Sequence, residues 1–311
     1  MKKRQNQGVK AYYTDHFVLP LPPGHRFPME KYRLLRDLVS LNPQIELHEP
    51  AAATDRDLLR AHDSDYIEAV TKGHLTETQV REIGFPWSEA MVERSRRSAG
   101  ATIAACVAAI EEGVSVNLAG GTHHAYADKG SGFCVFNDAA VAARYVQAIQ
   151  ATRVAVIDLD VHQGNGTAAI LGADPSCFTL SLHGEKNFPF RKEGSHLDVG
   201  LSDGCGDREY LETLQQALID LEGRFNPELI IYLAGADPHE GDRLGRLKLT
   251  MQGMGQRDQM VLGFARELQC PIAIAMAGGY GRNIQTTVDV HHQTIQLALQ
   301  YHQQINAKAH E

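Results

Sequence analysis

The chain has 311 residues, and 43% of them are hydrophobic, which is enough for a substantial buried core in one large α/β domain or two smaller domains. Thirty basic and 38 acidic residues give a formal net charge of −8, which argues against broad binding to nucleic acid or to anionic membranes. The basic start is followed by no apolar segment, and no apolar run approaches about 20 residues, so we expect neither a signal peptide nor a membrane-spanning helix.

Short strands and helices are predicted for the first third of the chain. Apolar residues at helical spacing over 29–41 stop near Asn42 and Pro43, and an alanine-rich segment over 88–112 ends at Gly113. The elements expected in this part are strands at 10–13 and 45–48 and helices at 29–41, 55–61, 64–72 and 88–112.

From residue 114 onward strands alternate with helices, a pattern typical of a parallel sheet covered on both faces. We expect strands at 114–118, 154–159, 178–183, 229–234 and 271–276, and helices at 138–151, 208–224, 252–268 and 284–301. No break in composition divides the chain, so we predict one α/β domain over residues 1–311, with a parallel sheet of about eight strands flanked by helices. We expect frayed ends at residues 1–9 and 303–311.

The five cysteines are scattered along the chain, and no two of them form a CxxC pair. Such cysteines are typical of small buried side chains in a reducing compartment. We therefore expect a cytoplasmic protein without disulfides.

Polar and glycine-rich segments follow five of the expected strands. In a parallel α/β sheet the active site lies beyond the carboxyl ends of the strands. The five segments read AGGTHHA, DVHQGNG, HGEKNFPF, GADPHEGDRLG and AGGYGRN. We therefore expect the functional residues at this edge of the sheet.

Three polar side chains stand at alternate positions where the strand at 154–159 ends, namely Asp158, Asp160 and His162. Residues two apart project from the same face of a strand, so these side chains are expected to converge. Two carboxylates and an imidazole suit a divalent cation better than an apolar core. Asp237 closes another apolar strand at a Gly-Ala-Asp turn and is the strongest candidate for a further ligand. One histidine and two aspartates leave an open position on Zn²⁺, Fe²⁺ or Co²⁺.

Two adjacent histidines, His123 and His124, follow another strand in a glycine-rich loop. Near a metal-activated water, one imidazole can remove the proton while the other stays cationic or donates to a leaving amine. Each ring needs a partner that orients it, and Asp158 and Asn165 flank the metal-binding segment at suitable places. Tyr280 stands between two glycines, and its hydroxyl is suited to stabilising an oxyanion.

Six motifs, taken in order, resemble the zinc-dependent histone deacetylase family within the arginase/deacetylase fold. They are GTHHA, GFCVFND, DLDVHQGNG, SLHGE, the GAD turn with GDRLG, and AGGY. The resemblance extends over residues 10–300 in organisation and is most specific over 117–283. It implies that Zn²⁺ is bound by Asp160, His162 and Asp237.

The same resemblance implies roles for the residues around the metal. His124 would be the general base and acid, with His123 as its electrostatic partner. Asp158 would pair with His123 and Asn165 with His124, while Tyr280 would donate to the oxyanion. Phe133 and Phe188 would form the walls of an acyl-lysine tunnel, and the full set of implied substrate-binding residues is Gly132, Phe133, Phe188, Leu244 and Gly278. The implied surroundings of a structural K⁺ are Asp158, Ser181 and the carbonyls of Asp160, His162 and Leu182.

Two details of the resemblance concern the subgroup and the substrate. Asn165 stands where class I members carry aspartate, and GFPWSEA with EGDRLG resembles the class IV branch and its bacterial relatives. Leu244 occupies the place of the acidic gatekeeper that marks the polyamine deacetylases. We expect removal of an acetyl or longer fatty acyl group from a lysine-like amine on a peptide or protein. Small N-acyl amines, including N-acetylpolyamines, are alternative substrates. The sequence does not determine the oligomeric state.

Two alternatives belong to other functional classes. The segment IDLDV also fits the DxDx[TV] start of haloacid dehalogenase-type phosphatases, with Mg²⁺ as the metal, but that hypothesis leaves the histidine pair, Asp237 and Tyr280 without a role. A deacetylase-like binding module that has lost activity is expected to lack a metal ligand, the histidine pair or the tyrosine. All of these residues are present in the sequence.

Overall fold

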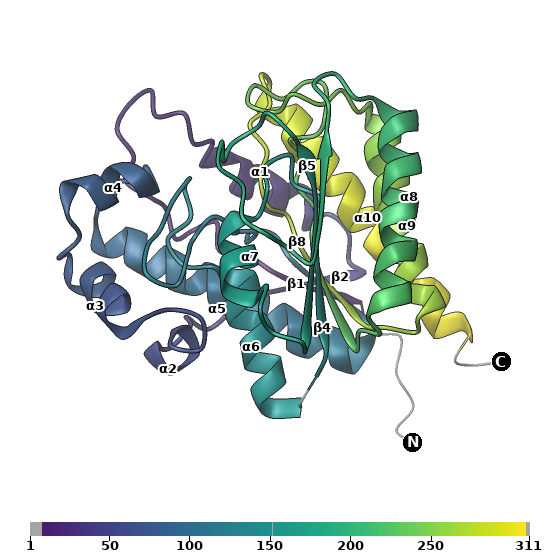
Figure 1. The fold of residues 1–311 in the computed structure, drawn as a ribbon, viewed down its shortest axis with the longest axis horizontal. Coiled ribbons are helices and arrows are strands. Elements are labelled where there is room, and N and C mark those ends of the chain that lie inside the picture. The colour runs from purple at the N-terminus through teal and green to yellow at the C-terminus, as the bar shows by residue number, and fades with distance from the viewer. Residues whose placement is uncertain (1–7, 151, 309–311) are drawn as a thin grey trace.

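One parallel sheet of eight strands forms the centre of the computed structural model, which describes residues 8–150 and 152–308 (Figure 1). The order across the sheet is β2-β1-β3-β8-β7-β4-β5-β6, and each neighbouring pair is parallel. The strands in chain order are β1 Val9–Tyr12, β2 Ile45–His48, β3 Val114–Asn117, β4 Val154–Asp158, β5 Cys177–Gly184, β6 Leu197–Leu201, β7 Leu229–Leu233 and β8 Ile272–Ala275. The predicted α/β class and parallel sheet are confirmed.

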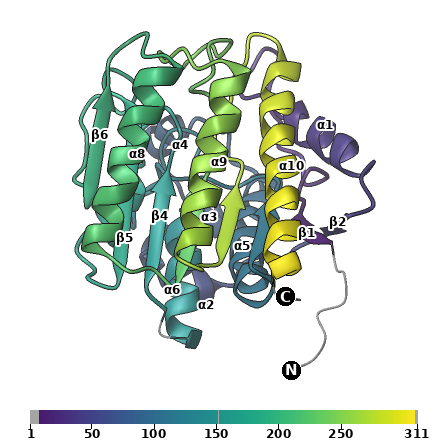
Figure 2. The same ribbon diagram turned by 90° about the vertical axis from the view of Figure 1, so that its right-hand side faces the viewer.

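Helices cover both faces of this sheet. In chain order they are α1 Glu30–Val39, α2 Asp55–Leu58, α3 Ser64–Lys72, α4 Glu77–Ile83, α5 Glu89–Glu112, α6 Asp138–Gln150, α7 Asn165–Leu171, α8 Asp207–Arg224, α9 Met251–Glu267 and α10 Ile284–Lys308. Figure 1 views the sheet nearly edge-on, with α5, α6 and α7 on one side and α8 and α9 on the other. In Figure 2, α8, α9 and α10 stand side by side across one face.

The central strands are apolar on both faces because each face packs against a layer of helices. In β4, Val154 and Val156 belong to the core that α5 and α6 cover, whereas Ala155 and Ile157 belong to the core that α8, α9 and α10 cover. This two-sided burial explains the continuous apolar run before Asp158. All five cysteines are buried and unpaired, as expected.

Three short elements have no counterpart among those expected from the sequence, namely α4, α7 and β6. In α4 the Thr76 hydroxyl accepts the N–H of Gln79, and the Gln79 side chain accepts the N–H of Thr76. Helix α7 begins at Asn165, inside a Gly-Asn-Gly sequence that is typical of a turn. Strand β6 lies at the edge of the sheet and is only partly buried. Elements of this kind carry too little hydrophobic periodicity to be recognised.

The last helix extends further along the chain than predicted. Helix α10 continues to Lys308, because Ile305 lies one turn after Tyr301 and packs against the same core. The expected helix end at residue 301 is therefore wrong, whereas fraying of the termini stays a prediction. Residues 1–7, 151 and 309–311 lie outside the described part. No helix within the described residues is long and apolar enough to cross a membrane.

The strand order brings four carboxyl ends together in the middle of the sheet. After β3 the chain forms β4, extends the sheet through β5 and β6, and then returns to insert β7 and β8 between β4 and β3. In open α/β sheets, ligands bind where the strand order reverses in this way. The loops after β3, β4, β7 and β8 therefore meet at one place.

Candidate active site

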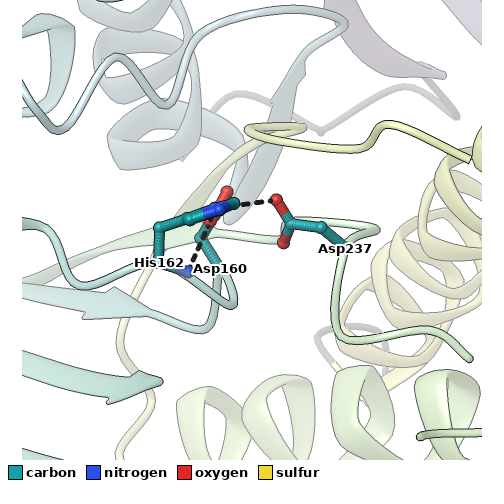
Figure 3. Close-up of side chains that lie close together, drawn as sticks. All are labelled: Asp160, His162 and Asp237. Carbon is teal, nitrogen blue, oxygen red and sulfur yellow. Dashed lines mark hydrogen bonds and ion pairs between the residues drawn. The ribbon is translucent and has the colours of Figure 1, made fainter. Parts of the chain in front are cut away.

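Asp160, His162 and Asp237 converge because β4 and β7 are neighbouring strands. Asp158, the last residue of β4, is in register with Leu233, the last residue of β7. The segments that follow carry the three side chains toward one another (Figure 3). Each side chain offers one ligand atom, and these atoms all lie within 4.8 Å of one another.

The donor set fits a divalent cation. His162 Nδ1 lies 2.9 Å from Asp160 Oδ1 and 3.3 Å from Asp237 Oδ2. Asp237 Oδ2 is buried, and apart from the ion pair with His162 it receives no hydrogen bond of good geometry from the described residues. Since a buried carboxylate oxygen without a donor is costly, this oxygen is best satisfied by a cation. One imidazole and two carboxylates are a donor set typical of Zn²⁺ and Fe²⁺ sites.

The protonation of the three side chains agrees with this fit. Burial, and then the charge of Asp160, raise the pKa of Asp237 to about 7. Burial opposes the charged form of His162, but the hydrogen bond with Asp160 and the ion pair with Asp237 outweigh it and raise the pKa of His162 to about 10. Two carboxylates at this distance in a buried site require a positive charge beside them. A protonated His162 supplies one, and a divalent ion that binds the ring would displace that proton and take over the charge.

Gly278 brings the backbone of the loop after β8 against the same carboxylates. Its N–H donates to Asp160 Oδ2 at 2.8 Å. A Cβ at this position would lie within van der Waals overlap of both Asp237 Oδ2 and Asp160 Oδ2. The loop therefore requires glycine at position 278.

The two histidines are held by different partners. His123 Nδ1 lies 2.6 Å from Asp158 Oδ2, and His124 Nδ1 lies 2.7 Å from Asn165 Oδ1. Their Nε2 atoms are 3.2 Å apart. Burial disfavours the charged form of His123, but Asp158 outweighs it and raises the pKa of His123 to about 9. Burial and the charge of His123 hold the pKa of His124 well below its usual range. One ring is therefore cationic and the other neutral near pH 7.

An aspartate that sequence reasoning missed, Asp138, shapes the histidine loop. It is fully buried at the start of α6, and its carboxylate accepts the N–H groups of Gly121 and Thr122 at 2.9 and 2.7 Å. The Thr122 hydroxyl donates to the same carboxylate at 2.7 Å. Asp138 ends the motif GFCVFND, so its position in that motif was the available signal.

Tyr280 is held by Asp242, another residue that was not predicted. Asp242 Oδ2 accepts the N–H of Tyr280 at 2.6 Å, and Oδ1 accepts the N–H groups of Leu244 and Gly245. One buried carboxylate thus joins the tyrosine loop to the loop after β7. Burial raises the pKa of Tyr280 well above its usual range, so the phenol stays protonated and keeps a hydrogen to donate.

A cavity of about 550 Å³ opens onto these groups. Asp160 and His162 face into it, together with His123, His124 and Tyr280. All the residues expected to bind substrate line it as well, namely Gly132, Phe133, Phe188, Leu244 and Gly278.

The walls of the cavity approach the histidines closely. The Phe188 ring stands edge-on to His124, with 4.9 Å between the ring centroids. Gly132 has a φ of 53°, and a Cβ there would come to 2.8 Å from the His124 ring, so this turn also requires glycine.

Comparison with known proteins decides the family. The histone deacetylase domain matches residues 25–295. The chain belongs to the histone deacetylase family. It is 42% identical over 288 residues to an uncharacterized protein of Picosynechococcus sp., covering 91% of this chain and 96% of that one. It is 34% identical over 270 residues to Histone deacetylase 2 of Arabidopsis thaliana, covering 82% of this chain and 70% of that one.

Solved structures agree with this family. The crystal structure of a histone deacetylase homologue complexed with SAHA superimposes with a TM-score of 0.79 at 27% identity, covering 94% of this chain and 84% of that one. The family resemblance stated from the motifs is confirmed. The phosphatase alternative loses its support, because Asp158, which would be the nucleophile, is buried against His123.

The N-terminal part of this histone deacetylase domain supplies a wall that the sequence did not predict. Phe27 packs 5.4 Å from Phe133 and 6.3 Å from Tyr280, measured between ring centroids. Lys31 in α1 is buried, and its Nζ donates to the carbonyls of Ala277 and Gly279 at 3.3 Å. These residues stand far from the motifs in the sequence, and no local pattern marks them as part of a site.

The residues implied around a structural K⁺ are also neighbours. Asp158 and Ser181 are in register on β4 and β5, and Leu182 is the next residue of β5. Asp158 Oδ1 accepts the N–H of Asp160 at 3.1 Å, and Ser181 Oγ lies 3.0 Å from His183 Nδ1. Potassium binding at this place stays a prediction.

Proposed function

We propose that the chain is a metal-dependent amide hydrolase that removes an acetyl or longer fatty acyl group from a lysine-like amine. The observation that carries this proposal is the buried cluster of Asp160, His162 and Asp237, which lies beside the histidine pair at the cavity. Membership of the histone deacetylase family supports deacylation as the reaction. Zn²⁺ is the proposed ion, and Fe²⁺ and Co²⁺ suit the same ligands.

When bound, the divalent ion supplies a Lewis acid that polarises the amide carbonyl and acidifies the attacking water. His124 is the proposed general base, since its neutral ring has Nδ1 bonded to Asn165 and offers an unprotonated Nε2, which lies 3.2 Å from His123 Nε2, as the proton acceptor. The same nitrogen then passes the proton to the leaving amine. His123 stays cationic against Asp158 and stabilises negative charge that develops nearby.

Tyr280 is the proposed donor to the oxyanion. Its hydroxyl stays protonated in the buried site, and its backbone is fixed by Asp242. A structural K⁺ at Asp158, Ser181 and Leu182 would hold β4 and β5 at the end where the metal-binding segment begins.

Acyl-lysine on a peptide or protein is the proposed substrate class. Leu244 lines the cavity, and by the family resemblance it takes the place of the acidic gatekeeper of polyamine deacetylases, so a polycationic amine would find no carboxylate at this position. N-acetylpolyamines are the second candidate, and they share the same catalytic groups.

The test is a panel of acyl-lysine peptides with acetyl, butyryl, octanoyl and myristoyl groups, assayed beside N-acetylpolyamines. We expect hydrolysis of at least one acyl-lysine peptide, loss of activity after chelation, and recovery with Zn²⁺, Fe²⁺ or Co²⁺. Hydrolysis of phosphate esters without deacylation would contradict the proposal, and so would deacylation that survives complete removal of metal.

A further inference from the structure

The mouth of the cavity carries an excess of positive charge, although the chain has a formal net charge of −8. Its cationic lining residues are Arg26, Lys31, Lys186 and Arg246, and its acidic lining residues are Glu82 and Asp160. Asp160 belongs to the proposed metal site, and Lys31 is buried behind the tyrosine loop. At the surface, Glu82 therefore faces the positive charges of Arg26, Lys186 and Arg246.

Arg26 is fixed at the tunnel wall without an acidic partner. Its side chain is exposed, and its guanidinium lies 5.2 Å from the centre of the Phe133 ring. This cation–π contact orients the positive charge at the tunnel entrance. Among the described residues, no carboxylate lies within ion-pair distance of it.

Lys186 and Arg246 stand on two loops that Asn187 ties together. The Asn187 side chain is buried, donates to the carbonyl of Leu244 at 2.8 Å and accepts the N–H of Arg246 at 3.2 Å. Within the described residues Lys186 has no ion pair, and Arg246 pairs with Asp203 at 3.0 Å with both side chains more than a third exposed. Such an exposed pair is weak, so Arg246 keeps much of its capacity to attract an anion.

An exposed aromatic side chain on the same rim indicates that the acylated amine belongs to a molecule larger than a metabolite. Phe190 lines the entrance, yet 89% of its surface is exposed. A small amine held inside the tunnel leaves this ring in water, whereas a peptide segment that crosses the mouth covers it. Phe188, which is 37% exposed, continues this apolar surface inward.

We propose that the substrate is an acidic protein segment in which the acylated lysine is flanked by aspartate or glutamate. This inference rests on the proposed deacylase function and specifies the carrier of the acyl group. Carboxylates on both sides of the lysine complement the cations of three separate loops, which raises the rate of encounter and fixes the register. The same cations repel lysine-rich tails and polyamines.

The test uses three peptides of equal length that differ only in the residues flanking one acyl-lysine, which are aspartates, serines or lysines. The metal-loaded protein is assayed at about 20 mM and about 500 mM NaCl, since exposed charge pairs are screened by salt. We expect kcat/KM for the acidic peptide to exceed that for the basic peptide about tenfold at low salt and about twofold at high salt.

Charge reversal at the rim supplies the matched variants. Lys186→Glu and Arg26→Glu should each lower the ratio of kcat/KM for acidic over basic peptide about threefold. Arg266→Glu makes the same change of charge at the far end of α9, away from the strand ends that form the mouth, and should leave this ratio unchanged. Circular dichroism checks that all three variants are folded.

The outcomes separate this inference from the proposed function. The acidic segment is ruled out if the serine peptide is hydrolysed as fast as the acidic peptide. It is also ruled out if the basic peptide or an N-acetylpolyamine is hydrolysed faster than the acidic peptide. In both cases the proposed deacylase function is retained. If the metal-loaded protein hydrolyses none of the acyl amines, both proposals fall together.

Discussion

Asn165 Oδ1 lies 2.7 Å from His124 Nδ1, so a neutral amide orients the ring that we propose as the general base. His123, on the adjacent position of the same loop, faces the carboxylate of Asp158 instead. The two partners keep the two rings in different charge states, because a carboxylate stabilises an imidazolium and an amide does not.

Exchanging the amide for a carboxylate should change the pH dependence of the reaction. In Asn165→Asp the new charge stabilises protonated His124 and raises its pKa. Since the neutral ring is the active form, the acidic limb of the profile of kcat/KM against pH should move upward by about one unit. Tyr126→Phe removes the other hydrogen bond of the Asn165 amide without adding charge, and should leave the limb in place. If the acidic limb of the profile does not move in Asn165→Asp, His124 is not the general base.

Asp237 Oδ2 is buried with His162 as its ion-pair partner, which makes Asp237 the most direct test of the metal site. Asp237→Ala should reduce the bound metal, measured by elemental analysis, to background and lower kcat/KM at least about 10³-fold. Tyr280→Phe is the comparison, because it should keep the metal and lose about 10²-fold to 10³-fold in kcat. Full metal content in Asp237→Ala, or metal loss in Tyr280→Phe, would contradict the roles proposed here.

Asp242 is expected to act on the reaction through the position of Tyr280. Asp242→Asn replaces an acceptor of three backbone N–H groups by a side chain that also carries donors, so the tyrosine loop shifts. We expect kcat to fall about tenfold while metal content and KM change little. Asp207→Asn makes the same substitution at the start of α8, where the carboxylate accepts from Thr250 just before α9, and should not lower kcat. Equal kcat values in the two variants would show that Asp242 does not position Tyr280 for the reaction.

His62 should make the folded state sensitive to mild acid. It is buried, its Nε2 accepts the N–H of Asn137, and burial lowers its pKa to about 4 from the ordinary 6.5. Between these values the unfolded chain binds a proton that the folded chain excludes, so the free energy of unfolding falls as the pH drops from about 6.5 to about 4. In urea titrations, the free energy of unfolding of His62→Gln should fall by about 2 kcal/mol less than that of the wild type between pH 7 and pH 5. The same substitution at the exposed His74 should leave this fall in the free energy of unfolding as large as in the wild type. If His62→Gln also loses as much stability as the wild type, His62 is not the source of the pH dependence.

Strand periodicity made much of the fold and the centre of the site predictable. Buried strands and alternating positions after β4 were enough to predict that Asp160 and His162 converge, and the rule for strand ends added Asp237. The motif resemblance supplied the pairing of each histidine with its partner. Asp138 and Asp242 escaped prediction because they bind backbone N–H groups of distant loops, which no local sequence pattern records. The short elements α4, α7 and β6 escaped because capping and edge pairing define them more than hydrophobic periodicity does.

The insertion of β7 between β4 and β8 has a consequence for how the protein is made. A nascent chain that has emerged only as far as β6 holds Asp160 and His162 but not Asp237, and the edge of β4 that later pairs with β7 has no partner. Neither the ligand set nor the centre of the sheet exists until Leu229–Leu233 and Ile272–Ala275 have entered. Loading of the proposed metal would therefore follow the entry of both strands, and bound ion would be a measure of completed folding.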